Sequence, residues 1–124
     1  MRTLVACALV LALATTARAA TISSPVIFGA YTQTTAQCVV FNGGTSPLSV
    51  TVKILNEGGG VVRSTTCDGP LPAGEFCSDA TSISSGVGYA CSATAGSTAN
   101  LRGALTIEET NGTDQRPIRS AALH

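Results

Sequence analysis

The residues best able to do chemistry in this 124-residue chain are its cysteines. Thiols bind metals, act as nucleophiles or form disulfides, and their spacing helps to separate these uses. A zinc site needs close cysteine pairs separated by about two to four residues. The closest pair here, Cys67 and Cys77, is ten residues apart. Together with Cys38 and Cys91 they make an even set after residue 19, which favours two disulfides over a metal site.

The sequence has few residues that are suited to acid–base catalysis. The single histidine, His124, is the last residue, and we expect a terminal residue to be mobile and unsuited as a base or ligand. Asp68, Glu75 and Asp79 surround a predicted loop, and solvated acids are common in loops. We expect no catalytic residue, no metal and no cofactor. A hydrolase that uses Asp68 or Glu75 and a calcium site at Asp68 and Asp79 are the alternatives left open.

The N-terminal segment has the three parts of a secretory signal. Arg2 provides a positive start, residues 4–14 form an apolar run, and Ala17-Arg18-Ala19 fits a cleavage site. The run is shorter than the about 20 residues that span a bilayer. We therefore expect a signal peptide over 1–19, cleavage after Ala19, and no membrane insertion afterwards. Residues 20–124 are expected to fold as one domain, secreted or periplasmic, where no thiol pool reduces disulfides.

The charge of the mature chain argues against nucleic-acid binding. Without Arg2 and Arg18, five basic residues face seven acidic ones, so the net charge is −2. A protein that binds phosphate backbones or anionic lipids needs a basic patch, and none is present. A protein or surface ligand of unknown identity is the remaining class of partner.

Strand periodicity dominates the mature sequence. Residues 48–54 and 101–108 alternate apolar and polar side chains, as half-buried strands do. Residues 38–41 are apolar on both faces, which indicates a central strand. Further candidate strands are 25–31, 60–66, 76–83, 86–95 and 115–121. Glycine-rich turns, among them Asn42-Gly43-Gly44, separate the strands with residues that tolerate positive φ. About seven to eight antiparallel strands predict an all-β sandwich or barrel.

Four cysteines allow three pairings, and strand positions favour one of them. Cys38 lies in the second predicted strand and Cys91 in the sixth, whereas Cys67 and Cys77 flank a turn-rich loop. We therefore expect Cys38–Cys91 to join two sheets and Cys67–Cys77 to close a local loop. The chain has five aromatic residues and no tryptophan, so the core must consist of Val, Ile, Leu and Ala.

These residues resemble bacterial immunoglobulin-like modules. Cys38 and Cys91 occupy the strands that carry the inter-sheet disulfide of that fold, and Tyr89 precedes Cys91 by two positions, as in a tyrosine corner. Residues 42–50 are similar to the N-x-G-x-x-P-L-x-V turn of the abnormal-spindle/Hydin and CARDB types. Residues 71–75 look like their L-x-P-G turn with altered spacing. The core tryptophan is missing and the loop 67–77 is extra. The resemblance implies an immunoglobulin-like β-sandwich and no activity.

The loop 67–77 is the sharpest candidate surface in the sequence. Pro70, Pro72 and a disulfide would hold it rigid and present Leu71 to a partner, which lowers the entropy lost on binding. The interpretation that we favour is an ordinary turn between strands whose leucine packs inward, because most such turns only connect strands. The sequence thus predicts a secreted, non-catalytic binding or structural module, with an inhibitor of a secreted hydrolase as the alternative. Asn111-Gly112-Thr113 matches a glycosylation sequon.

Overall fold

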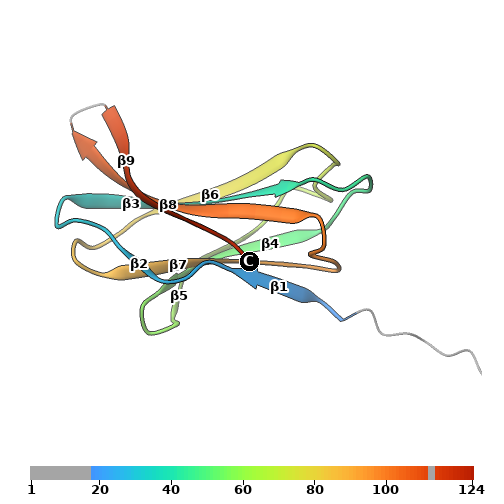
Figure 1. The fold of residues 1–124 in the computed structure, drawn as a ribbon, viewed down its shortest axis with the longest axis horizontal. Coiled ribbons are helices and arrows are strands. Elements are labelled where there is room, and N and C mark those ends of the chain that lie inside the picture. The colour runs from blue at the N-terminus through green and yellow to red at the C-terminus, as the bar shows by residue number, and fades with distance from the viewer. Residues whose placement is uncertain (1–17, 112–113) are drawn as a thin grey trace, which may run out of the picture.

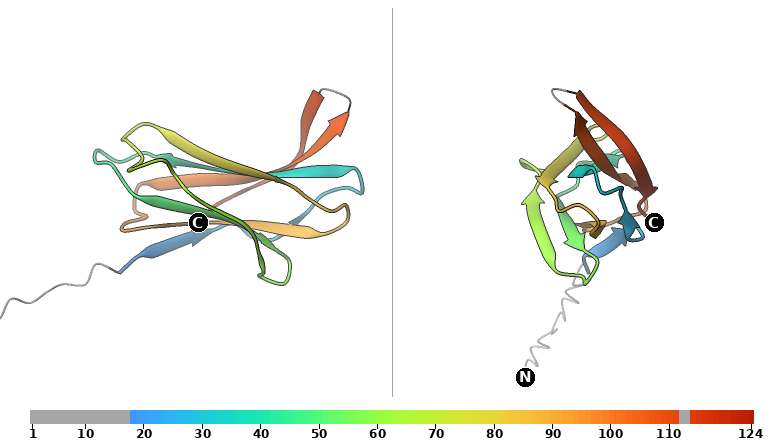
Figure 2. Two further views of the ribbon diagram at one scale, coloured as in Figure 1. Left: turned by 180° about the vertical axis from the view of Figure 1, so that it is seen from behind. Right: turned by 90° about the vertical axis from the view of Figure 1, so that its left-hand side faces the viewer.

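The computed structural model describes residues 18–111 and 114–124. Within these residues the chain forms nine strands in two antiparallel sheets that pack as a β-sandwich (Figures 1 and 2). The all-β class predicted from the sequence is confirmed. The predicted signal segment lies outside the described residues apart from its last two, as do Gly112 and Thr113 of the sequon.

The two sheets divide the strands almost evenly. Sheet A has the order β1-β7-β4-β5, with β2 also paired to β7. Sheet B has the order β6-β3-β8-β9. The strands of sheet A are β1 (Ala20–Ser23), β2 (Ile27–Phe28), β4 (Val50–Asn56), β5 (Val61–Thr66) and β7 (Gly88–Ala95). Those of sheet B are β3 (Gln33–Asn42), β6 (Phe76–Ser82), β8 (Leu101–Asn111) and β9 (Asp114–Ala122).

Most predicted strands are present, and the opening one is wrong. Residues 38–41 belong to β3, which pairs with both β6 and β8 and is therefore central, as expected. The predicted strand 25–31 is reduced to the two residues of β2, because Pro25 cannot donate to a ladder. After β2 the chain turns, and the N–H of Gln33 donates to the carbonyl of Ala30 (3.0 Å). A strand that the sequence did not suggest, β1, begins at Ala20 and pairs with β7.

The core lies between the sheets and is almost wholly aliphatic. The alternating residues of β4 point inward, with Val50, Val52 and Ile54 fully buried. On the facing sheet, Leu105 and Ile107 of β8 are equally buried. Among the described residues, Tyr89 is the one aromatic side chain in this core. The expectation of a core built from Val, Ile, Leu and Ala is confirmed.

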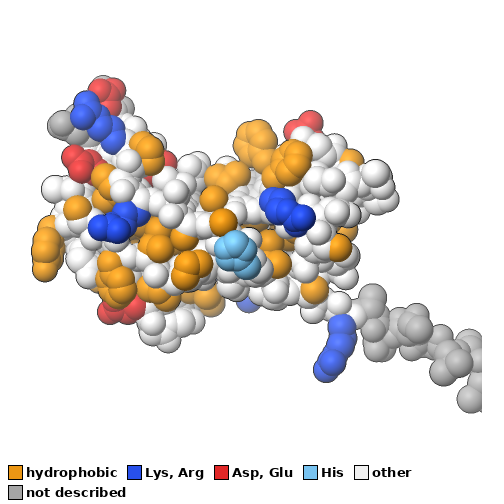
Figure 3. Space-filling view, viewed as in Figure 1, with side chains coloured by type: hydrophobic (Ala, Val, Ile, Leu, Met, Phe, Trp, Pro, Cys, Tyr) orange, Lys and Arg blue, Asp and Glu red, His pale blue; other side chains and the backbone are white. Residues whose placement is uncertain are grey.

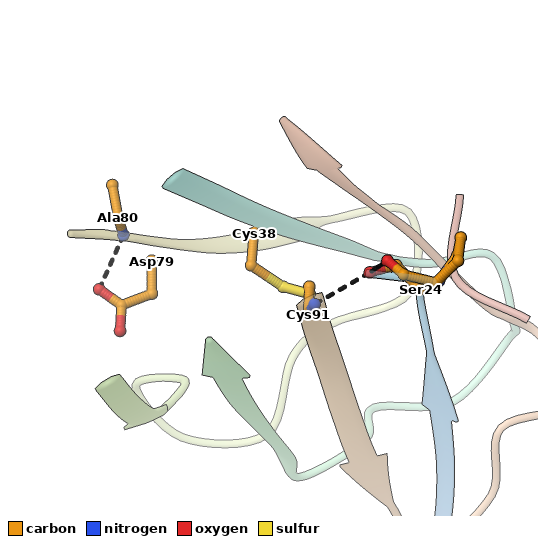
Figure 4. Close-up of a disulfide and its surroundings, with 6 residues drawn as sticks. Ser24, Cys38, Asp79, Ala80 and Cys91 are labelled. Atoms are coloured by element: carbon orange, nitrogen blue, oxygen red, sulfur yellow. Dashed lines mark hydrogen bonds between the residues drawn. A yellow bond between two sulfur atoms is a disulfide. The ribbon is translucent and has the colours of Figure 1, made fainter. Parts of the chain in front are cut away.

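A disulfide crosses this core between the central strands of the two sheets. Cys38 of β3 is bonded to Cys91 of β7 with 5.8 Å between the Cα atoms, and neither residue is exposed (Figure 4). The N–H of Cys91 donates to the hydroxyl of Ser24 (2.9 Å), and the N–H of Ser24 donates to the carbonyl of Cys91 (2.8 Å). The second disulfide joins Cys67 and Cys77. This pairing agrees with the one that the strand positions favoured.

The C-terminal end is held in place, contrary to the expectation that it would be mobile. After β9 the chain crosses to sheet A, where His124 exchanges two backbone hydrogen bonds of 3.1 Å with Ser23 of β1. Leu123 is buried in the core, and its N–H donates to the carbonyl of Gly103 (2.9 Å). The imidazole of His124 remains on the surface. Backbone pairing thus links the first strand to the last residue.

We predict that the two disulfides contribute unequally to stability. Replacing Cys38 and Cys91 by alanine should lower the free energy of unfolding by about 4 kcal/mol or more, because their loop is long and both side chains are buried. Replacing Cys67 and Cys77 should cost about 3 kcal/mol, since the closed loop is short. Urea unfolding of both double variants measures the difference. A larger loss from the Cys67/Cys77 variant would contradict this assignment.

Candidate functional site

Most of the aromatic side chains lie on the surface. Relative exposure is 87% for Tyr31, 66% for Phe76, 53% for Phe28 and 42% for Phe41. An aromatic side chain buries about 150–250 Å² when it enters a core. A chain with so few aromatic residues would gain stability from placing them inside. Their exposure therefore points to a role on the surface.

Two of these side chains lie next to each other on the outer face of sheet B. Phe41 of β3 pairs with Phe76 of β6 on one side and with Arg102 of β8 on the other. We call these three residues the aromatic platform. Figure 3 shows large hydrophobic side chains standing out from this end of the sheet beside a basic one. Nη1 of Arg102 donates to the carbonyls of Ala99 (3.1 Å) and Leu101 (2.8 Å), which holds the guanidinium in place.

The platform is fixed from below by Asn42, the residue after Phe41. Asn42 is fully buried, and its Nδ2 donates to the carbonyls of Ser46 (2.9 Å) and Leu71 (3.0 Å). Its Oδ1 accepts the N–H of Gly44 (3.0 Å). One side chain therefore ties the end of β3 to the loop that follows it and to the disulfide loop.

The backbone of Asn42 adds two further links to the disulfide loop. Its N–H donates to the carbonyl of Glu75 (3.0 Å), and its carbonyl accepts the N–H of Gly74 (2.8 Å). The sequence suggested Asn42 only as a turn residue that tolerates positive φ. Among the described residues, positive φ occurs only at glycines, including Gly69 and Gly74 of the disulfide loop, and not at Asn42.

The disulfide loop does not present Leu71 to a partner, and the expected inward packing of this leucine is what the structure shows. Leu71 is 5% exposed and belongs to the core, where it forms a β-bridge with Leu48. Its N–H donates to the carbonyl of Leu48 (2.7 Å), and the N–H of Leu48 donates back (3.0 Å). Pro70 and Pro72 remain exposed. The leucine turns inward because the aliphatic core gains more from it than the surface does.

A shallow depression of about 440 Å³ adjoins the platform along the free edge of β6. Phe76 is shared between the depression and the platform, and Pro72 forms part of the wall. Asp68 and Glu75, both exposed, supply its two carboxylates. Across this end of the molecule the order is therefore acidic depression, Phe76, Phe41, Arg102.

The third acid of this region, Asp79, is used inside the fold. Its side chain is 8% exposed and accepts hydrogen bonds from Nε of Arg63 (2.7 Å), the hydroxyl of Thr65 and the N–H of Ala80 (2.9 Å; Figure 4). Burial raises the pKa of Asp79, but the hydrogen bonds from Thr65, Arg63 and Ala80, with the charge of Arg63, outweigh it and leave the pKa lowered. The ionised carboxylate thus closes the gap between the β5 and β6 edges.

These positions bear on the chemistry that the sequence left open. A general acid at neutral pH needs a raised pKa, and Asp79 has a lowered one. Asp68 and Glu75 stand at an open surface rather than in an enclosed cleft. The described residues bring together no three His, Cys, Asp or Glu side chains that would suit a metal. They also include no helix long and apolar enough to cross a membrane.

A second depression, of about 530 Å³, lies between β2 and β9 and includes exposed Phe28 and Val26 with Arg119. Behind it, Gln33 is buried, and its Nε2 donates to the carbonyls of Ser84 (2.7 Å) and Val87 (2.8 Å). The Oε1 of Gln33 has no hydrogen-bond partner among the described residues. The neighbours of Phe28 here carry no second aromatic ring, so this surface lacks the paired rings of the platform.

Sequence reasoning missed the platform, although alternation contained a signal for it. Cys38 and Val40 point inward, so Phe41 must point outward. Cys77 faces the core in the same way, which sends Phe76 outward. What alternation does not give is the pairing of the two rings, because that depends on the register between strands 35 residues apart in sequence.

Comparisons with known proteins add no family. No family model and no curated protein matches the chain. Among solved structures, the chain is similar to "Crystal Structure of Thermotoga maritima 1070", with a TM-score of 0.46 and 10% sequence identity, over 84% of this chain and 91% of that one. A similarity this weak carries no argument about function.

We predict that the fully buried Asn42 stabilises the platform end far more than a turn asparagine with solvent-exposed hydrogen bonds stabilises its turn. Asn42→Ala removes the side-chain donor to the carbonyls of Ser46 and Leu71 and the acceptor of the Gly44 N–H at a fully buried position, and it should lower the free energy of unfolding by about 2–4 kcal/mol. The matched control is Asn56→Ala. Oδ1 of this half-buried residue accepts solvent-exposed hydrogen bonds from the N–H groups of Gly58 and Gly60, and its loss should cost under about 1 kcal/mol. Equal losses in urea unfolding would show that Asn42 is an ordinary turn residue.

We predict an acid-dependent loss of stability from Asp79. Its folded pKa lies below that of an unfolded aspartate, which is about 4. The stabilisation is therefore complete above about pH 5 and is lost as the pH falls through the folded pKa. Asp79→Asn should cost about 2 kcal/mol at neutral pH and flatten the acidic part of the stability profile. The control Asp68→Asn, at an exposed loop residue, should keep the wild-type profile in urea unfolding at graded pH.

Proposed function

We propose that this chain is an exported, non-catalytic binding module that engages its partner through the aromatic platform. The observation that carries the proposal is the pair of exposed phenylalanines, Phe41 and Phe76, held side by side on neighbouring strands. Aromatic and arginine side chains dominate interface hot spots. A β-sheet holds them with little conformational freedom, which reduces the entropy lost when a partner docks.

Export is supported by the state of the cysteines and by the first strand. Both disulfides lie within the described residues and suit an oxidising compartment. Strand β1 begins at Ala20, directly after the predicted cleavage site. A secreted or periplasmic destination for residues 20–124, after removal of a signal peptide, is therefore part of the proposal.

An immunoglobulin-like type of sandwich is supported by the surroundings of Tyr89. Its hydroxyl accepts the N–H of Ser84, five residues upstream (3.0 Å), which is the bond of a tyrosine corner. Tyr89 precedes Cys91 by two residues, and Cys91 is bonded to Cys38 of the opposite sheet.

One feature of the topology departs from that type. In immunoglobulin domains the strand after the second cysteine returns to the same sheet. Here β8 leaves β7 and pairs with β3 in sheet B, while β1 and β2 take the place beside β7. The proposed likeness is therefore one of architecture and of the disulfide and tyrosine contacts, not of strand order.

The non-catalytic nature of the module is supported by how its polar groups are used. Asp79 is bound as an anion by Arg63 and Thr65, and His124 stands on the surface at the C-terminus. The hydrolase-inhibitor alternative loses its main support in the position of Leu71. With Leu71 buried, the disulfide loop offers no apolar side chain between its two prolines.

The test is a capture experiment with paired variants. The purified mature protein is immobilised and exposed to the extracellular or periplasmic fraction of its source. We expect a protein that binds the wild type and Phe28→Ser, and is lost with Phe41→Ser/Phe76→Ser. Each hot-spot phenylalanine contributes about 2 kcal/mol or more, so affinity should fall at least about thirtyfold for each one. A partner retained equally by all three proteins would contradict the proposal.

A further inference from the structure

The outer face of sheet B is unusually poor in charge for a solvent-facing sheet. Side chains that face water in an antiparallel sheet are normally polar or charged. On this face β6 and β3 contribute only uncharged residues, mainly Ser, Thr, Ala and the two phenylalanines. Within the described strands β6, β3 and β8, the outward charges are Arg102 and Glu108, at opposite ends of β8. Depletion of charge around aromatic residues is the composition of an interface centre.

Acidic and basic groups lie on opposite sides of the two phenylalanines, so two copies of this face can be complementary in charge. The acidic depression with Asp68 and Glu75 lies beyond the free edge of β6, and Arg102 lies on β8, on the other side of β3. Consider two copies of this face related by a twofold axis that runs along the strands between β6 and β3. Phe76 of one copy then faces Phe41 of the other, and each Arg102 faces the other copy's acidic depression.

We propose that the partner of the aromatic platform is a second copy of this chain, in a face-to-face dimer of sheet B. The inference rests on the proposed function, since it names the occupant of the same surface. A closed twofold interface uses the same patch on both copies. The arrangement joins opposite charges twice and places no like charges of the platform opposite each other.

The size of the face is sufficient for such a dimer. In this arrangement the contact spans the acidic depression, β6, β3 and β8, which at about 4.8 Å for each strand spacing gives a width of about 19 Å, and strands of this length run about 25 Å or more. Two such faces remove on the order of 1,000 Å² from solvent, which is the lower limit for a specific interface. The dimer is therefore expected to be reversible, with a dissociation constant in the micromolar range.

The state of Arg102 favours a carboxylate partner from outside its own chain. Its Nη1 is held by two backbone carbonyls, and it forms no ion pair with a described acid. Glu75 and Asp68 likewise have no described basic partner. A guanidinium in a fixed position loses little rotamer entropy when a carboxylate binds it.

Sedimentation equilibrium of the purified mature protein tests the dimer, with a charge swap as the decisive measurement. We expect the wild type to dimerise and high salt to weaken it. Arg102→Glu and Glu75→Arg should each raise the dissociation constant at least about tenfold, because each sets like charges against each other. The double variant Arg102→Glu/Glu75→Arg should restore it to within about threefold, since the opposite charges meet again.

Two further variants locate the interface. Phe41→Ser/Phe76→Ser should yield a folded monomer, whereas Phe28→Ser, at an exposed phenylalanine of sheet A, should dimerise as the wild type does. Circular dichroism confirms that each variant is folded. A wild type that stays monomeric up to millimolar concentration overturns the dimer, as does a failure of the charge swap to restore association.

The two proposals fail separately. If the wild type is monomeric but a different protein is captured through Phe41 and Phe76, the dimer is wrong and the binding platform stands. If the wild type dimerises and Phe41→Ser/Phe76→Ser leaves the dimer intact, self-association occurs elsewhere, and the platform loses its assigned role in it.

Discussion

The covalent bond between Cys38 and Cys91 is the constraint on which the sandwich depends. It joins the central strand of sheet B to the central strand of sheet A through a core with one aromatic side chain, Tyr89, among the described residues. An aliphatic core of this size leaves little margin against the entropy of the unfolded chain. A cross-link restricts that unfolded chain and so makes a modest core sufficient. The same bond is consistent with a compartment in which thiols oxidise.

Because the cross-link and the aliphatic side chains stabilise the interior, aromatic side chains are available for the surface. Phe41 and Phe76 stand on a sheet that is covalently fixed to its partner sheet, and Asn42 fixes their end of β3 to the disulfide loop. Rigid support of this kind is what separates a binding surface from a chance exposure of apolar groups. Under the proposed function, stability and recognition therefore depend on different residue types in this chain.

Much of the fold follows from local pattern. Alternation placed Val50, Val52 and Ile54 of β4 inward, and strand order favoured the observed cysteine pairing. The opening strand was wrong because β1 has only four residues and begins directly after the expected cleavage site, so it shows little of a strand pattern. The inward turn of Leu71 depends on a bridge to Leu48, more than twenty residues away, and no local pattern records it.

The candidate site was harder to predict than the fold for the same reason. The platform is made by register across β6, β3 and β8, three strands that are not consecutive in sequence. Alternation gives the face on which a side chain lies, but not its neighbours on that face. The role of Asn42 was equally hard to predict, because three segments of the chain meet at its buried side-chain amide.

The backbone bonds between Ser23 and His124 bring the first strand and the last residue of the sandwich together. Domains with adjacent ends tolerate insertion into a loop of another protein and tolerate relocation of their own ends. In a circular permutant, a short linker would join His124 to Ala20, and the new ends would lie in the exposed hairpin turn at Gly58–Gly59. With its two ends this close, the sandwich could be inserted into a loop of a host protein through two neighbouring connections.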